Sequence, residues 1–305
     1  MENRQEVLEK ASAASPLHAP PVFRVKGKLR LRFEFCQSTK QTVLTSCEQQ
    51  PPLKVVRGFP VQDGGLLVHL HNLSGGVLGG DHLKTNFSVG SRARVQLTTV
   101  GATRLYRSRL EDETAVQTNE IELSENALVE YLPDALIPFK GSRYFQQTSI
   151  ELAEGAGLFW WETVAPGREA RAEVFAYDSL RLNLDIRARG HLLAQERIRL
   201  EPARIQLSSP VRLGQYRYFT TFYVCRVGLE TTRWPELEKN LAELAEQLSF
   251  RSEILWGVSA LPAHGLVIRA VSMKSRSIMP GLLAFWQAAK QRLYGQDAVP
   301  PRKIN

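Results

Sequence analysis

The sequence predicts a mainly β protein with a large stacked or sandwich-like β architecture and two helices near the C-terminus. Apolar and polar residues alternate with a period of two along most of the chain, as they do in half-buried strands. Clusters of Gly, Pro, Asn and Ser separate these stretches at regular spacing, as turns do. A helical period of about 3.6 residues is evident only in two late stretches.

The first 21 residues are polar and lack the apolar centre of a secretory signal, so we expect a disordered leader before a single β-rich domain over residues 22–305. No apolar run is long enough to span a bilayer, and no membrane contact is expected. The three cysteines show neither metal-site spacing nor a disulfide framework, which fits the reducing cytoplasm.

Strands are expected over residues 23–35, 42–46, 53–56 and 65–72. In the first of them basic residues alternate with apolar ones, which predicts one basic strand face, formed by Arg24, Lys26, Lys28, Arg30 and Arg32. An acidic protein partner or a nucleic acid would both fit such a face. The interleaved aromatic residues of a single-strand binder are missing, so no nucleic acid is expected.

Paired glycines followed by an aspartate open the next stretch: Gly75, Gly76, Gly79, Gly80 and Asp81. Strands are predicted over residues 82–89 and 92–97, joined by a tight hairpin turn at residues 90–91. The glycines precede no Lys-Ser/Thr pair and no helix, which argues against a phosphate-binding loop and favours a turn between strands.

Three histidines near these glycines are weak metal candidates. His69 and His71 are two residues apart, so a strand would place both on one face, and His82 follows Asp81 directly. Paired solvent-facing histidines are the more common outcome of such a pattern.

The pattern stays β from residue 103 to residue 200, with strands expected over residues 116–123, 127–132, 144–152, 158–164, 182–189 and 192–200. A long strand over 216–227 and two later strands over 253–258 and 266–271 follow. No strict short repeat proves a solenoid.

The first helix is predicted to begin near Pro235, and the second runs from Pro280 to Gly295. Lys290 and Arg292 are expected to complement the dipole at the C-terminal end of the second helix. Its apolar face includes Phe285 and Trp286. Such a face is most often core, but a partner surface is an alternative because the helix is close to the C-terminus.

No pattern for a catalytic site is present. The sequence lacks a GxSxG elbow, a cysteine with a nearby histidine, and a cluster of carboxylates at close spacing. We therefore do not expect an enzyme, although a hydrolase site assembled from dispersed residues stays open as a third interpretation.

Several motifs in order resemble the UreD family of urease accessory proteins over roughly residues 22–303. The GGxxGGDxL stretch is followed by TTxxATRxYRS, which comprises Thr98, Thr99, Arg104, Tyr106, Arg107 and Ser108. EYLPD, IPF and GSRY follow over residues 130–144, and then come Gly167-Arg168, Glu173-x-Phe175, Trp286 and a PPR ending at Arg302. Like Phe285 and Trp286, Arg302 is a partner-surface candidate.

The resemblance implies a non-catalytic scaffold of urease maturation. Such a protein binds the urease apoprotein and UreF, and through UreF it binds UreG. It would help deliver nickel through its interior, holding no cofactor tightly and Ni²⁺ only in transit. Two departures from the family are visible: Ala172 stands where relatives often have glycine, and no tryptophan follows the PPR ending.

A route for Ni²⁺ needs oxygen ligands that bind weakly, because several thiolates or imidazoles would trap the ion and an apolar interior would reject it. The acids in otherwise apolar strands are therefore the candidates: Asp81, Glu130, Glu162 and Glu173. A turn cap is the simpler explanation for Asp81. Ion pairs with Arg104, Arg107 or Arg143 would explain Glu130 and Glu162. The alternative function is a β-rich binding module that uses the basic face for acidic polymers or nucleic acid.

Overall fold

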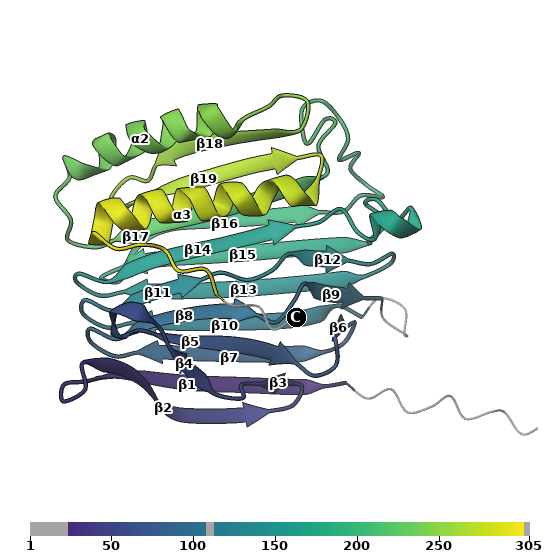
Figure 1. Cartoon of the computed structure of the whole chain (residues 1–305). Helices are drawn as coiled ribbons and strands as arrows, with labels where there is room; N and C mark the ends of the chain where they lie inside the picture. The colour runs from purple at the N-terminus through teal and green to yellow at the C-terminus, as the bar shows by residue number, and fades with distance from the viewer. Residues whose placement is uncertain (1–23, 108–112, 302–305) are drawn as a thin grey trace, which may run out of the picture.

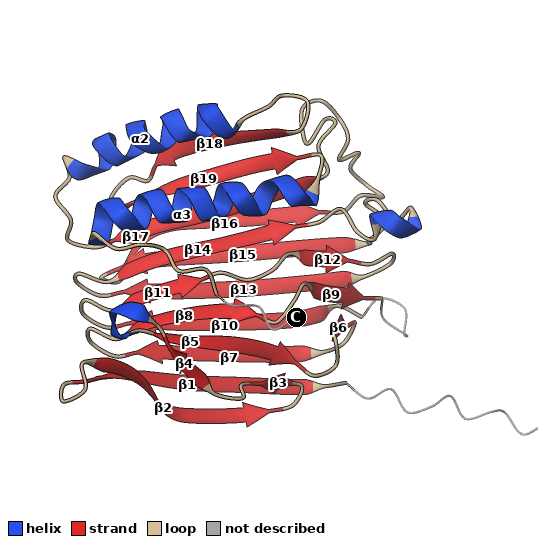
Figure 2. Ribbon diagram, in the orientation of Figure 1, coloured by secondary structure: helices blue, strands red, loops and turns tan. Residues whose placement is uncertain are grey.

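Two β-sheets face each other, and two helices cover part of the outer side of the second sheet (Figures 1 and 2). This computed structural model describes residues 24–107 and 113–301. The predicted leader, Ser108 and Arg302 lie outside the described residues. The prediction of a mainly β architecture with two helices near the C-terminus is confirmed.

The first sheet has seven strands in the order β16-β15-β13-β10-β7-β1-β2. Their bounds are β1 Lys26–Cys36, β2 Gln41–Gln50, β7 His82–Val89, β10 Ala115–Leu123, β13 Arg143–Leu152, β15 Ser179–Ala188 and β16 His191–Leu200.

The second sheet has twelve strands, eight of them on the path β18-β19-β17-β14-β11-β8-β5-β3. The bounds on this path are β3 Leu53–Lys54, β5 Leu66–Asn72, β8 Arg94–Thr99, β11 Leu128–Tyr131, β14 Gly157–Val164, β17 Tyr218–Arg226, β18 Ile254–Ala260 and β19 Gly265–Ser272. Four short strands lie off the path: β4 Gly58–Pro60, β6 Val77–Leu78, β9 Thr103–Tyr106 and β12 Leu136–Pro138.

Between β5 and β15 the long strands alternate between the two sheets, so each sheet grows by parallel pairing. In the first sheet β7, β10, β13 and β15 are parallel neighbours, and in the second sheet β5, β8, β11 and β14 are. The arrangement is a coil of the chain flanked by antiparallel strands at both ends.

The predicted hairpin at residues 90–91 is wrong. β7 and β8 lie in different sheets, and the amide of Gly90 donates to the carbonyl of Phe33 on β1 instead of closing a hairpin. A period-two pattern identifies a strand but not its partner, and a tight turn can also lead from one sheet to the facing one.

Residues 24–107 and 113–301 form two hydrophobic cores, one on each side of the second sheet. The inner core lies between the sheets and includes Leu31, Phe33 and Val68. The outer core lies between the second sheet and the helices α2 Arg233–Leu248 and α3 Ile278–Tyr294. Phe285 and Trp286 are fully buried in the outer core, so in this structure they are core residues and form no surface patch.

Gly295 ends α3 in the left-handed conformation, as predicted, with φ 65°. Lys290 does not project toward solvent at the helix end but is buried against the second sheet. The described part of the chain also contains the short 3-10 turns η1 Gln62–Gly64, η2 Glu169–Arg171 and η3 Ser275–Ser277. Neither α2 nor α3 has the combination of length and apolar character that a membrane span requires.

Candidate functional site

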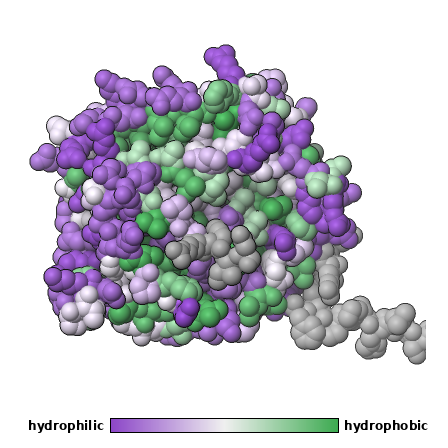
Figure 3. Space-filling model, viewed as in Figure 1, coloured by the Kyte–Doolittle hydropathy of each residue, from purple (hydrophilic) through white to green (hydrophobic). Residues whose placement is uncertain are grey.

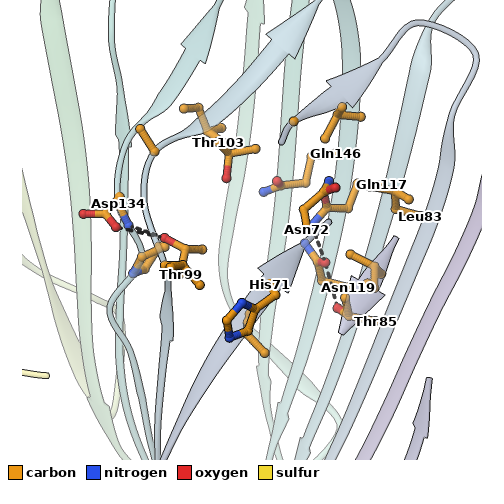
Figure 4. A pocket seen from close by; sticks show the side chains of 18 of the residues that line it. His71, Asn72, Leu83, Thr85, Thr99, Thr103, Gln117, Asn119, Asp134 and Gln146 are labelled. Atoms are coloured by element: carbon orange, nitrogen blue, oxygen red, sulfur yellow. Dashed lines mark hydrogen bonds between the residues drawn. The ribbon is translucent and has the colours of Figure 1, made fainter. Parts of the chain in front are cut away.

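A cavity of about 370 Å³ lies between the two sheets (Figure 4). It opens beside the turn after β8 and the glycine loop after β5, where the lining residues Val100, Gly101, Arg104 and Gly75 are exposed. Leu70, Val77 and Leu83 form part of its apolar wall. The mouth therefore lies at the stretch whose glycines and TTxxATR pattern stood out in the sequence.

One wall of the cavity is polar and belongs to the first sheet. The amide oxygen Oδ1 of Asn119 accepts hydrogen bonds from the hydroxyl of Thr85 at 2.8 Å and from Nε2 of Gln117 at 3.0 Å. The hydroxyl of Tyr144 lies 3.0 Å from Oε1 of Gln117 and 3.0 Å from Oε1 of Gln146. Figure 4 shows Thr85, Gln117, Asn119 and Gln146 on neighbouring strands, turned toward the same space.

Glu162 faces this wall from β14 in the second sheet. Its Oε1 accepts a hydrogen bond of 2.6 Å from Nε2 of Gln146. Burial disfavours the charged form and raises the pKa of Glu162 to about 7, the bond from Gln146 opposes that rise, and the negative charge of Glu196 adds to it. Near neutral pH this carboxyl group is therefore divided between its charged and neutral forms. Beside it in the cavity wall, the rings of Tyr131 and Trp160 stack at 3.9 Å.

Several residues of the sequence motifs lie near the mouth of the cavity and form its rim. The hydroxyl of Tyr106 donates to the carbonyl of Gly75, and its ring meets Phe139 edge-on at 4.9 Å. The guanidinium of Arg168 lies 4.1 Å from the centre of the Phe139 ring and pairs with Glu173. A contact chain thus joins the glycine loop to the segment around residues 168–173.

Glu173 is an ion-pair partner on this rim. Besides Arg168, it accepts the amide of Lys140 at 3.2 Å, and the hydrogen bond from Arg168 is the main reason that the pKa of Glu173 is lowered. Ala172 before it has φ 55° and ψ 25°, a left-handed conformation that favours glycine. An alanine in this conformation carries some backbone strain.

Asp81 caps the glycine turn. Its Oδ2 accepts the amide of Leu78 at 2.9 Å, and burial raises the pKa of its carboxyl group. Gly80 before it has φ 90°. Asp81 is not among the residues that line the cavity, so the structure gives it the turn-capping role that was the simpler alternative.

Glu130 lies on the opposite side of the second sheet, in the outer core. Its Oε1 is 3.0 Å from Nζ of Lys290 and accepts a 3.0 Å hydrogen bond from Nε1 of Trp286. Its partner is thus a lysine on α3 and not Arg104, Arg107 or Arg143. Arg143 pairs with Asp178 at 3.0 Å.

The three histidines are spread over different surroundings. His71 lines the cavity, and burial lowers its pKa, helped by the nearby His69 and Lys54. His69 is buried and meets Phe59 edge-on, and Nδ1 of His82 lies 3.1 Å from the carbonyl of Gly80. Among residues 24–107 and 113–301, no three His, Cys, Asp or Glu side chains form a group that could hold a metal ion.

The remaining motif residues support the loops around the mouth. The hydroxyl of Thr98 donates to the carbonyl of Leu132 at 2.7 Å, and Thr99 exchanges hydrogen bonds with Asp134 (Figure 4). Arg104 lines the mouth, and the side chain of Arg107 lies against Gly141.

The sequence interpretation missed the polar wall. A signal was present, because polar residues stand at strand positions whose neighbours two residues away are buried and apolar. Thr85 lies in this way between Leu83 and Phe87. The other wall residues are in phase with a buried isoleucine farther along their strands, Gln117 and Asn119 with Ile121 on β10, and Tyr144 and Gln146 with Ile150 on β13.

The chain is similar to known proteins along nearly all of its length. The model of the UreD urease accessory protein family matches residues 25–305. The urease accessory protein UreD of Herpetosiphon aurantiacus is 48% identical over 281 residues, covering 92% of this chain and 97% of that protein. The UreD of Pseudomonas aeruginosa is 32% identical, covering 82% and 85%, and that of Bacillus sp. strain TB-90 is 27% identical, covering 90% and 97%.

Proposed function

The chain belongs to the UreD family of urease accessory proteins, with a role in urease maturation, and from this premise we propose that it is a non-catalytic, cytoplasmic scaffold for nickel delivery. In this proposal it acts as an assembly chaperone that binds the urease apoprotein together with UreF, and through UreF the partner UreG. Ni²⁺ is cargo in transit and not a resident cofactor.

The observation that carries the proposal is a carboxylate beside the polar wall of the cavity between the sheets. Glu162 offers one negative charge, and the amide and hydroxyl oxygens around it offer weak neutral ligands. Such a set can replace part of the water shell of a divalent cation without holding the ion tightly. A site with several thiolates or imidazoles would retain nickel.

The four candidate acids differ in how well they suit this role. Glu162 faces the cavity and accepts a hydrogen bond from the neutral amide of Gln146, so its charge is available to a cation. Glu130 and Glu173 are engaged by Lys290 and Arg168, and Asp81 caps a turn. We therefore assign the first place on the route to Glu162.

The test is urease activation in cells or extracts that contain the other maturation proteins. The tagged chain is co-expressed with UreF, UreG and the urease apoprotein, the complex is captured, and urease activity is measured after addition of nickel. We expect a stable complex and loss of activation when this chain is omitted.

The variant Glu162→Gln keeps the size and the hydrogen-bonding capacity of the side chain but removes its charge. We expect complex formation to be retained and activation at limiting nickel to fall by about tenfold or more, since one lost charge interaction of about 1.4 kcal/mol corresponds to that factor. Glu122→Gln, at an exposed position of β10, is the matched control. Normal activation by Glu162→Gln would contradict the proposed route.

A further inference from the structure

We propose that the sheet edge at strand β16, together with the inner face of β18, is a docking site for an extended acidic segment of a partner protein. The segment would pair with β16 as an added strand of the first sheet. None of the strands β16, β18 and β19 contributes a residue to the lining of the cavity, so this inference does not depend on the proposed passage of nickel.

The two sheets do not end at the same level near β16. This strand is the last of the first sheet, and in the described part of the chain it pairs only with β15. It faces β17 and β19, because the carboxylate of Glu196 lies 3.4 Å from the hydroxyl of Thr221 and 3.0 Å from the guanidinium of Arg269. The second sheet continues past β19 with β18 (Figure 1). A strand added beside β16 would therefore lie over β19 and β18.

The burial of the inward side chains shows that the cover of the inner core ends at β16. Ile186 on β15 is fully buried, whereas its cross-strand partner Ala194 on β16 is only partly buried. Leu182 on β15 and its partner Ile198 on β16 show the same difference. The inward side of β16 therefore has room for a further neighbour.

The inner face of β18 is open beyond this edge. Trp256 faces the outer core, so by alternation Gly257 and Ser259 point to the inner side. Both are exposed, and a Cβ atom at Gly257 would meet nothing within 4 Å. The loop that follows β16 packs against the inner core through Ile205 and Leu213 and leaves these two positions uncovered. A large side chain of an added strand fits above Gly257.

The charges beside the edge favour an acidic occupant. Asp185 on the outer face of β15 and Glu201 directly after β16 are opposed by four arginines on the outer face of β15 and β16: Arg181, Arg187, Arg197 and Arg199. Four positive charges against two negative ones leave +2 on this strip. The side chains of Arg197 and Arg199 are 41% and 60% exposed, so both can reach an added strand.

A second copy of this chain is a poorer occupant of the same edge. Pairing of β16 with itself would bring two rows of arginines together, and like charges on neighbouring strands repel. An acidic strand is attracted instead, since its outward side chains would lie about 5 Å from Arg197 and Arg199 as cross-strand neighbours. Main-chain hydrogen bonds to the edge supply further affinity, as they do wherever an extended segment adds a strand to a sheet.

Binding of a labelled peptide to the full-length protein tests the site. The probe is a nine-residue peptide of alternating glutamate and tyrosine, followed by fluorescence anisotropy at low salt. We expect saturable binding and slower hydrogen exchange of the amides of residues 191–200. A peptide with lysine in place of glutamate should bind about tenfold more weakly. A peptide of the same composition with its glutamates grouped at one end loses the alternation, and it should leave the exchange of these amides unchanged.

Arg197→Gln combined with Arg199→Gln should weaken binding of the alternating acidic peptide about fivefold, as expected for two lost cross-strand charge pairs. Lys26→Gln combined with Arg32→Gln is the matched control, because it removes the same charge from exposed positions of β1, on the far side of the same sheet. The comparison of peptides uses the unaltered protein, so it stays decisive if the arginine variant does not fold.

Equal binding of the acidic and the basic peptide would overturn the proposed docking site. Unchanged exchange of the β16 amides in the presence of saturating acidic peptide would overturn it too. So would a dimer of the unaltered protein, seen by sedimentation without any peptide, in which the same amides are protected, because the edge would then serve a second copy.

Discussion

Glu130 and Glu162 are both acids within apolar strands of the same sheet, but they lie on opposite faces of it. Glu130 faces the helices and is held by Lys290 and Trp286. Glu162 faces the cavity, where a neutral amide is its hydrogen-bond partner. The comparison shows that a buried charge partner makes Glu130 part of the structure, whereas a carboxylate bonded to a neutral amide keeps a charge that suits a ligand.

Removing one member of the Glu130–Lys290 pair should give the largest effect. Both side chains are more than nine-tenths buried, so Lys290→Ala leaves an unpaired carboxylate in the outer core. We expect the free energy of unfolding to fall by about 3–5 kcal/mol, as measured by urea denaturation.

Replacement of both partners by apolar residues, Glu130→Met with Lys290→Met, is the control and should cost less than either single change, because it leaves no buried charge. A loss below about 1 kcal/mol for Lys290→Ala would show that the pair does not hold α3 in place.

Glu162→Gln should raise the free energy of unfolding above neutral pH, whereas Lys290→Ala lowers it. The folded-state pKa of about 7 is raised above the ordinary 4.5, so the wild-type protein loses stability as pH rises from 4.5 to 7. This difference in pKa between the folded and unfolded states lowers the free energy of unfolding by about 3 kcal/mol.

We therefore expect Glu162→Gln to match the wild type near pH 4.5 and to exceed it at pH 8 in urea denaturation. A variant that is less stable than the wild type at pH 8 would indicate that Glu162 is paired in the way Glu130 is.

The mouth of the cavity can be tested at a glycine of the loop after β5. A Cβ atom at Gly76 would lie 2.5 Å from the carbonyl oxygen of Arg104 and 2.5 Å from the ring of Tyr106, so Gly76→Ala must displace backbone. We expect a loss of about 2 kcal/mol in thermal or urea unfolding. Gly101→Ala, across the mouth, meets nothing within 4 Å and should be close to neutral.

The smallest expected effect concerns the backbone alone. Ala172→Gly relieves the left-handed conformation before Glu173 but adds freedom to the unfolded chain. The two contributions nearly cancel, so we expect a gain of about 0.5 kcal/mol. A loss of stability would mean that the alanine methyl group makes a packing contribution larger than its strain.

The strands and helices could largely be predicted from the sequence, because alternation and helical periodicity report which residues are buried. The pairing of β7 and β8 with different sheets could not, since the local pattern of residues 82–97 is the same in a hairpin and in a coil that passes between sheets.

The same limit applied to the site. The phase of alternation places Glu130 with Leu128, and Glu162 with Trp160, but it does not say which face of a sheet meets the helices and which meets the cavity. Only the position of Lys290, far along the chain, decides that question.

The bond between Trp286 and Glu130 joins residues 156 positions apart, and this separation has a consequence for synthesis on the ribosome. The coil of strands can pair progressively as the chain emerges, because successive strands lie close in sequence. Until α3 has left the exit tunnel, the carboxylate of Glu130 stays exposed on an incomplete sheet. We expect nascent chains that stop before α3 to be bound by general chaperones. We expect a protein from which α3 is deleted to be degraded.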